Sequence, residues 1–475
     1  MKILKPILGA LLFWVGLYAA EYRTWTNQDG RKLEAKAVAF EGDLVNLQLR
    51  SGKRYQVALN SLSQSDQDFV AELKEAQKEV LPYEKLNAVF GHDAFSEEST
   101  LWQRPAAELA ELLKVPVESK TDFSSSFRRY FISSREGEYR EREMFGAKAN
   151  TMAIYGNAEG LATRISIVYA NLGDIDLSST SYLSRGRFLE KAMEADADAL
   201  ESILTPILGE GVRQRFGEGA LRRTVTRWDA GDHAFVLSLT KAKYVGLEII
   251  PKEVADAEGE TERVTDSQLK KQLEKNIVEA ENGDVYLKNL PMIDQGPKGY
   301  CVPATAESAL RYMGVDADMY IIANNANTGI GGGTRISDLM VLMKKLAGRK
   351  GRSCRDINLT SLRLSSVTRF LDQGYPILWT MRSTKRYNEF ANNRTIKRRN
   401  LEWSEYVDTI EDDVKKNLKY TDEDSPDYHI CMIIGYNEDT EELAVRDSWG
   451  PQYAMRWVHV DEAAPFSDGG LIISK

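Results

Sequence analysis

The sequence predicts a multi-domain protein in which a small β domain is followed by two α+β domains. Its 475 residues exceed the length that one hydrophobic core normally organises, so two to four domains are expected. Residues 22–72 alternate apolar and polar side chains with a period of two, which is typical of half-buried strands. Between residues 251 and 283, Lys, Glu, Asp and Gln replace large apolar residues, which indicates a boundary between the second and third domains.

The composition is that of a globular protein, and it limits the expected partners. Hydrophobic residues make up 43% of the chain and charged residues 28%, which is ordinary for folded domains. The net charge of −9 argues against a nucleic-acid partner, because nucleic-acid-binding proteins gather excess Lys and Arg. The three cysteines are too few for a disulfide framework.

The first twenty residues are typical of a secretory signal. Two lysines precede an apolar run over residues 7–17, and small residues follow before Glu21. The run is shorter than the ~20 residues of a membrane span. Leu17 or Tyr18 occupies a position that is usually small before a cleavage site, so a retained anchor stays an alternative. We expect residues 1–20 to be a signal peptide or anchor and the protein to be exported, whether periplasmic, secreted or membrane-anchored.

Residues 21–72 are predicted to form strands followed by a closing helical turn. The informative features are Trp25, the Asp29–Gly30 turn, residues 57–62 and the tail at 66–70. With these features the segment resembles an SH3-like homology domain first named in a yeast endocytic adaptor and found in many exported bacterial proteins. The resemblance implies a small β barrel that binds or positions a partner, without identifying that partner.

Residues 84–255 are predicted to form an α+β domain of unknown type. Helical periodicity over 109–113 and 187–204 combines with strand-like alternation. His92 and His233 are interpreted as satisfied histidines without a role in a site. The alternating segments are residues 152–155, 164–169, 234–239 and 245–250.

Residues 256–281 are predicted to be a charged linker, and residues 282–475 to be the third domain. The linker contains few large apolar side chains, and its first part looks open to cleavage. This raises the hypothesis that the two upstream domains restrain the third until they are removed.

The third domain contains a cysteine at the predicted start of a helix. A loop rich in Gly and Pro ends at Cys301, and helical spacing follows over 304–313 until Gly314. The positive end of a helix dipole lowers the pKa of a thiol, and the free N–H groups can donate to an oxyanion. Gln295, six positions upstream, could supply a second donor from its side-chain amide.

A thiolate nucleophile needs a base, and the chain has only four histidines. His429 opens a hydrophobic strand 429 − 301 = 128 residues after Cys301, whereas His459 lies within a strand with no acceptor motif after it. Asp447 ends the next predicted strand after His429, and a carboxylate there can hold the imidazole in one tautomer. The predicted order of groups is therefore Cys301, His429, Asp447.

These residues resemble those of papain-like cysteine peptidases, in which nucleophile and base lie roughly 130 residues apart. The motifs Cys301-x-Pro303-Ala304 and Asp447-Ser448-Trp449-Gly450, with Gln295 upstream, are similar to the double-glycine leader peptidases and their exported stand-alone relatives. The resemblance implies a papain-like α+β fold and a thiol protease without cofactor that acts on a peptide or protein. It implies that Cys301 is the nucleophile, His429 the base and Asp447 the residue that orients it. It further implies that Gln295 lines the oxyanion hole and Trp449 shields the contact between His429 and Asp447.

Three departures and alternatives stay open. Val302 stands where the family often has Gly, and a charged insertion spans residues 384–427, as a lid or as a solvated excursion. The same scaffold could instead serve a transamidase or a cell-wall amidase, or a binding protein without catalysis.

Neither a metal site nor a phosphate site is expected. Only His429 and Cys431 have the short spacing of metal ligands, and the glycines at 329–333 are predicted to form a loop rather than a phosphate site.

Overall fold

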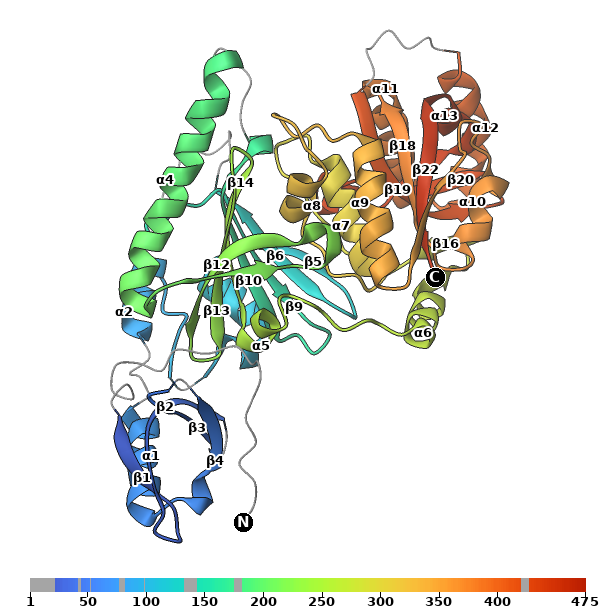
Figure 1. Ribbon diagram of the computed structural model, residues 1–475. Helices are drawn as coiled ribbons and strands as arrows, with labels where there is room; N and C mark the ends of the chain where they lie inside the picture. The colour runs from blue at the N-terminus through green and yellow to red at the C-terminus, as the bar shows by residue number, and fades with distance from the viewer. Residues whose placement is uncertain are drawn as a thin grey trace. The chain divides into compact units, whose positions relative to one another are not determined.

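The structure, a computed structural model, describes residues 22–41, 44–51, 53–76, 82–97, 99–131, 143–174, 182–419 and 427–475 (Figure 1). The chain divides into two compact units, residues 1–82 and 83–475. The expected signal or anchor at residues 1–20 lies outside the described residues. Within the described part of the chain, no helix is both long and apolar enough to cross a membrane.

The first unit is a four-stranded antiparallel sheet with one helix. Strands β1–β4 pair in chain order, and Trp25 fills the core with its indole N–H donating to the carbonyl of Ala35 at 2.9 Å. The strands and closing helix confirm the expected elements, while the likeness to SH3-like domains stays a prediction. The elements are β1 Arg23–Thr26, β2 Lys32–Glu41, β3 Leu44–Gln48, β4 Arg54–Ala58 and α1 Gln64–Ala76.

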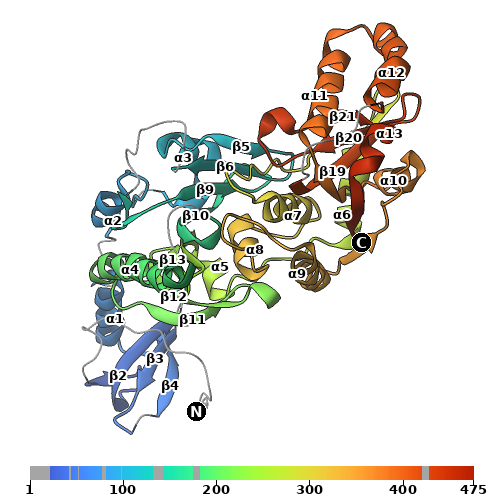
Figure 2. The same cartoon turned by 90° about the horizontal axis from the view of Figure 1, so that it is seen from above.

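The second unit begins with an eight-stranded antiparallel sheet, which we call the middle sheet. Its strand order is β11-β12-β13-β14-β10-β9-β6-β5. Helix α4 (Tyr182–Leu208) lies along one face, and helices of the C-terminal part lie on the other (Figures 1 and 2). The strands are β5 Val117–Lys120, β6 Ser125–Tyr130, β9 Thr151–Gly156, β10 Ala162–Asn171, β11 Val212–Phe216, β12 Arg223–Ala230, β13 His233–Thr240 and β14 Tyr244–Pro251. Beside them are α2 Tyr83–Phe90, α3 Ala106–Leu112, α5 Lys252–Asp256 and a short pair, β7 Glu143–Met144 and β8 Ala147–Lys148.

The segment expected to be a linker contains a packed helix. Helix α6 (Asp266–Asn276) begins with a capping box between Thr265 and Gln268, and it buries Leu269 and Leu273 in the core of the C-terminal part. Two leucines four positions apart are enough to give this charged helix one apolar stripe. The C-terminal part therefore starts earlier in the chain than residue 282.

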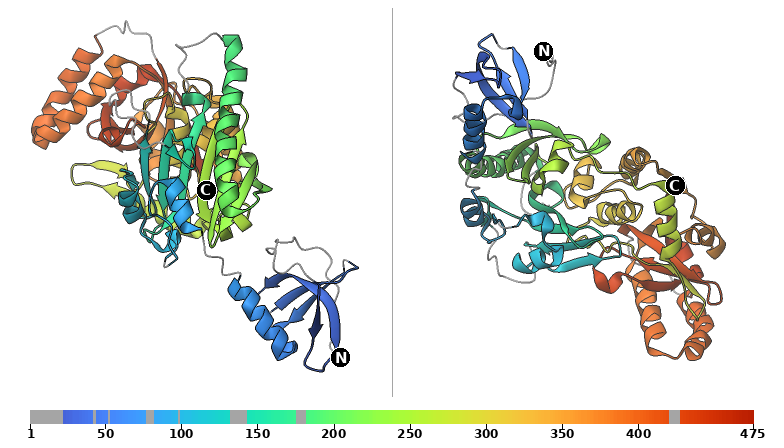
Figure 3. Two further views of the ribbon diagram at one scale, coloured as in Figure 1. Left: turned by 90° about the vertical axis from the view of Figure 1, so that its left-hand side faces the viewer. Right: turned by 90° about the horizontal axis from the view of Figure 1, so that it is seen from below.

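The C-terminal part is built on a second large sheet, with the order β15-β16-β19-β18-β22-β17 and with β20 and β21 added beside β19. The charged insertion forms two helices, α11 (Lys385–Asn400) and α12 (Trp403–Asn417), which lie side by side and project beyond the sheet (Figures 2 and 3). Tyr387 on α11 and Tyr406 on α12 are buried, so both helices are packed rather than surrounded by solvent. The strands are β15 Ile277–Glu279, β16 Asp284–Leu287, β17 Ser353–Ile357, β18 Ile377–Ser383, β19 Asp427–Asn437, β20 Glu442–Arg446, β21 Arg456–His459 and β22 Ser467–Ser474. The remaining helices are α7 Cys301–Tyr312, α8 Met319–Asn325, α9 Ile336–Arg349, α10 Leu364–Leu371 and α13 Val460–Ala463.

Candidate active site

Cys301 is the first residue of helix α7, as the sequence predicts. All residues of this helix except Cys301 and Arg311 are buried. The helix is therefore fixed in the core, while its first residue, Cys301, stays partly exposed. Tyr300 precedes it without a side-chain cap, which leaves the first N–H groups of the helix free of a capping side chain. Pro303 lacks an N–H and fits this first turn without the loss of a hydrogen bond.

Cys301 opens onto a cavity of about 750 Å³. His429 from β19, Gln295 from the loop before α7 and Trp449 from the turn after β20 line the same cavity. Val302 also lines it. The cavity therefore brings together a thiol, an imidazole and a side-chain amide that are up to 134 positions apart, from 295 to 429.

The imidazole of His429 lies between the thiol of Cys301 and the carboxylate of Asp447. Its Nε2 is 2.9 Å from Oδ1 of Asp447, and its side chain also hydrogen-bonds Cys301. The ring of Trp449 stacks on the imidazole, with centroids 4.6 Å apart and planes inclined by 26°. This indole covers one face of the imidazole.

Opposing effects set the pKa values of Cys301 and His429. Burial alone would raise the pKa of the Cys301 thiol, but the hydrogen bond and charge of His429 and nearby backbone N–H groups lower it below its usual value. Burial would lower the pKa of His429, yet Asp447 and Cys301 raise it to about 9. The two shifts together favour transfer of the thiol proton to the imidazole, which gives a thiolate beside an imidazolium.

Asp447 is buried and is held by a second cation that sequence analysis missed. Arg456 donates to Oδ2 of Asp447 from Nε at 3.0 Å and from Nη2 at 2.5 Å. Burial would raise the pKa of Asp447, but His429 and Arg456 keep it below the usual value of an aspartate. The signal in the sequence was an arginine at the start of a short strand. The β20–β21 hairpin pairs this Arg456 with Val445, two residues before Asp447.

The side-chain amide of Gln295 is held from both ends. The hydroxyl of Ser448 donates to Oε1 of Gln295 at 2.8 Å, and Nε2 donates to the carbonyl of Lys298 at 2.6 Å. The backbone N–H of Gln295 also donates to the carbonyl of Ser448 at 2.8 Å. These contacts decide which end of the amide carries the donors, and one N–H of Nε2 is left for a group in the cavity.

The other histidines and cysteines have structural surroundings. His233 is fully buried, with Nε2 accepting from the N–H of Leu101 at 3.2 Å, and His459 caps α13 by accepting from the N–H of Asp461. Neither lines the cavity beside Cys301. Cys354 and Cys431 are buried free thiols.

His429, Cys431 and Asp447 place possible ligand atoms within 4.8 Å of one another. The arrangement does not fit a metal ion, because Nε2 of His429 already contacts Asp447 and the guanidinium of Arg456 occupies the other carboxylate oxygen. A cation would have to displace one of these charged contacts. The chemistry of the donor set favours an acid–base pair over a metal site.

A protein-family model described as "Peptidase_C39 like family" matches residues 287–467. This range includes Cys301, His429 and Asp447. A search of curated proteins finds no match. The C-terminal part is therefore similar to peptidase C39-like domains, and the likeness points to a function of the cysteine-peptidase type.

Proposed function

We propose that this chain is an exported thiol peptidase in which Cys301, His429 and Asp447 act as a catalytic triad. One observation carries the proposal: His429 contacts both Cys301 and Asp447 at the wall of a cavity that Gln295 also lines. A nucleophile, its base and the group that orients the base are the parts that acyl transfer needs. The likeness of residues 287–467 to peptidase C39-like domains supports the same reaction class.

The reaction would proceed by acylation and hydrolysis. The thiolate of Cys301 attacks the carbonyl carbon of a peptide bond, and the carbonyl π electrons move to oxygen. The oxyanion then returns its electrons while the C–N bond breaks, and the imidazolium of His429 gives its proton to the leaving amine. Water, deprotonated by His429, attacks the thioester and releases the carboxylic acid and the Cys301 thiolate, and the proton stays on His429.

Two donors are available to the oxyanion. These are the backbone N–H of Cys301, at the positive end of helix α7, and the remaining N–H of the Gln295 amide. Trp449 and Arg456 act indirectly, by covering and neutralising the contact between His429 and Asp447. No step requires a cofactor.

The parts outside the peptidase-like domain have proposed roles as well. Residues 1–20 would export the chain and could tether it to a membrane, and the first unit would bind a partner in that compartment. The substrate would be an exposed peptide or protein segment, because the cavity beside Cys301 is open and partly polar rather than a closed apolar pocket.

The pH dependence of alkylation at Cys301 tests the proposal without a known substrate. Iodoacetamide labelling is followed by peptide mass in the wild type and in His429→Ala. We expect labelling of the wild type to persist well below the ordinary thiol pKa of ~8.5, and the variant to label only as pH approaches that value. Identical profiles in the two proteins would contradict the proposal and favour a binding protein on this scaffold.

Product analysis tests the reaction itself. A mixture of peptides is incubated with the wild type and with Cys301→Ala, and new termini are identified by mass. New carboxylates at internal positions, absent with the variant, indicate peptide hydrolysis. New amide bonds, or cleavage confined to cell-wall peptides, would instead identify the transamidase or amidase alternatives.

A further inference from the structure

The loop that carries Gln295 is anchored in the middle sheet. The hydroxyl of Tyr130 on β6 donates to the carbonyl of Asp294 at 2.5 Å, and its ring would lie 2.7 Å from a Cβ placed on Gly296. Gly296 has a φ of +70°, so both its conformation and this close approach require glycine. The loop that precedes Cys301 thus lies directly on the side chain of a residue from another sheet.

Lys298 is the second anchor. Its ammonium forms an ion pair with Asp174, which follows β10, and both side chains are largely buried. The same ammonium lies 5.9 Å, 5.2 Å and 5.0 Å from the ring centroids of Tyr130, Tyr300 and Tyr320. Its backbone carbonyl is the acceptor that holds the amide of Gln295.

All three aromatic rings around Lys298 are fixed by the middle sheet. Tyr130 belongs to β6, the hydroxyl of Tyr300 accepts from Asn171 on β10, and the hydroxyl of Tyr320 shares a 2.7 Å hydrogen bond with Thr151 on β9. Figure 2 shows these strands beside α7 and α8. The position of the Lys298 carbonyl, and through it of the Gln295 amide, therefore depends on three strands of the middle sheet.

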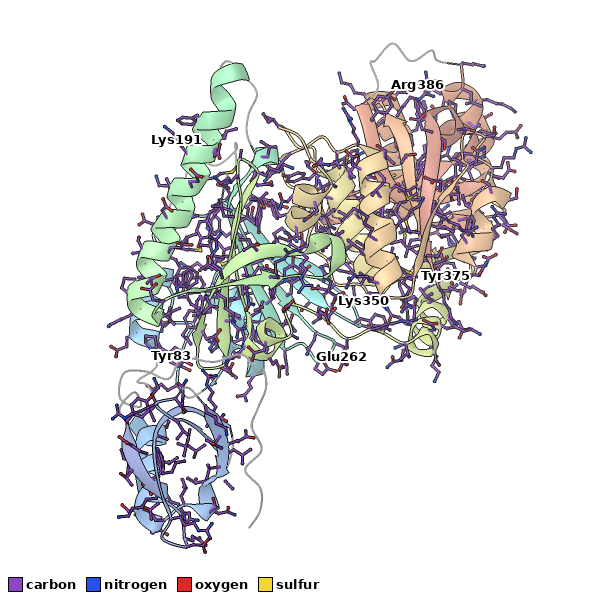
Figure 4. All side chains as sticks on the ribbon, in the orientation of Figure 1. Tyr83, Lys191, Glu262, Lys350, Tyr375 and Arg386 are labelled. Carbon is purple, nitrogen blue, oxygen red and sulfur yellow. The ribbon has the colours of Figure 1, made fainter. Side chains whose placement is uncertain are left out.

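Buried ion pairs join the middle sheet to the C-terminal part. Arg128 on β6 is buried between Glu118, at 2.6 Å, and Glu307 of helix α7, at 3.4 Å. At the other end of the contact, Lys350, labelled in Figure 4, donates to Glu218 at 2.7 Å. Separation would break these ion pairs and expose to water the apolar side chains that pack between the two parts.

We infer that the middle sheet is a positioning element of the active site, which holds Gln295 in the oxyanion hole through Tyr130, Lys298 and Asp174. This inference rests on the proposed function. It opposes the hypothesis that the region upstream of the C-terminal part merely restrains the enzyme, since removal of the middle sheet would free the Gln295 loop. In this role the residues of the middle sheet position Gln295 and take no part in the bond-making steps.

Two reactions of Cys301 distinguish a role in positioning Gln295 from a role only in the stability of the fold. Alkylation by iodoacetamide displaces iodide at a saturated carbon and needs no oxyanion hole. Acylation by 4-nitrophenyl acetate passes through an oxyanion, transfers acetyl to Sγ and releases 4-nitrophenolate. Both rates are measured in the full chain for wild type, Tyr130→Phe, Lys298→Met and Gln295→Ala. The matched control is Tyr169→Phe, which also removes a buried hydroxyl that donates to a carbonyl, at 3.2 Å from Met144, away from the loop.

We expect Tyr130→Phe and Lys298→Met to slow acylation about tenfold while alkylation changes less than about twofold, and Tyr169→Phe to change neither rate. Tyr130→Phe removes a single oxygen, so it keeps the test decisive where Lys298→Met does not fold. The result to compare is the ratio of the acylation rate to the alkylation rate. If this ratio falls in Gln295→Ala but is unchanged in Tyr130→Phe and Lys298→Met, the inference about the middle sheet is overturned while the proposed function stands. Equal losses of both rates in Tyr130→Phe would also overturn it. Unchanged ratios in all variants, Gln295→Ala included, would overturn the oxyanion role in the proposed function and this inference with it.

Discussion

Arg456 and Asp447 form a buried ion pair in which two guanidinium nitrogens meet one carboxylate oxygen, at 3.0 Å and 2.5 Å. The other oxygen of Asp447 faces His429. Arg456 also donates from Nη1 to Asn388 at 3.0 Å and to Asn392 at 3.1 Å, both on α11. The charged insertion thus holds Arg456, which in turn holds Asp447, the residue proposed to orient His429.

Replacement of Arg456 by Met should destabilise the protein by about 3–5 kcal/mol, because it leaves the carboxylate of Asp447 buried with one cation fewer. The free energy of unfolding is measured in urea at pH 7. Arg382→Met is the control: Arg382 pairs with Asp468 at 3.3 Å, but both are well exposed, so a change within about 0.5 kcal/mol is expected. Equal losses in the free energy of unfolding for the two substitutions would show that burial of Arg456 beside Asp447 adds no stability beyond that of an exposed ion pair.

The ion pair of His429 with Asp447 should make stability depend on pH in a defined direction. The folded pKa of His429, about 9, lies above the ordinary value of 6.5. Its contribution is therefore fully present below pH ~6.5 and is lost as pH rises through the folded pKa. In the wild type the lowered pKa of Cys301 opposes this trend, so the measurement is made in Cys301→Ala.

The free energy of unfolding of Cys301→Ala should fall between pH 6.5 and 9, and Cys301→Ala/His429→Gln should lose that fall. Without the thiolate of Cys301 the folded pKa of His429 is lower, so the fall should be complete before pH 9. Urea denaturation at four pH values measures both proteins. A fall of the same size in both would mean that other groups cause it.

Ser448 should act on the reaction only through Gln295. Its hydroxyl fixes the orientation of the Gln295 amide, so Ser448→Ala and Gln295→Ala should each slow acylation by 4-nitrophenyl acetate, by about tenfold or more. In the double variant the loss should be close to that of Gln295→Ala alone, since the two side chains serve one donor. Fully additive losses would assign Ser448 an independent role.

Leu273 tests whether helix α6 belongs to a folded core. Leu273→Ala should cost about 2–5 kcal/mol, because its side chain is buried against the C-terminal sheet. Lys270→Ala, on the exposed face of the same helix, should change the free energy of unfolding by less than about 0.5 kcal/mol. A neutral Leu273→Ala would support the loose linker that the composition suggests.

Local patterns in the sequence predicted much of this molecule. The strands around residues 152–155 and 245–250, the helix that starts at Cys301 and a strand through His429 are confirmed, although that strand begins at Asp427 rather than at His429. Each depends on periodicity and turn residues within a few positions. The same patterns placed a thiol at a helix start and a carboxylate at a strand end. These are properties of short segments, so the residues of the candidate site could be named before their distances were known.

Tertiary structure decided what those segments meet. No local pattern shows that Arg456 lies beside Asp447, that Leu273 anchors a charged helix, or that Tyr130 holds the loop before Cys301 from 164 positions away. These contacts arise from strand register and from the packing of the middle sheet against the C-terminal part, where side chains distant in sequence share one buried volume. A buried charge or hydroxyl must find a partner there, and only the fold determines which partner is within reach.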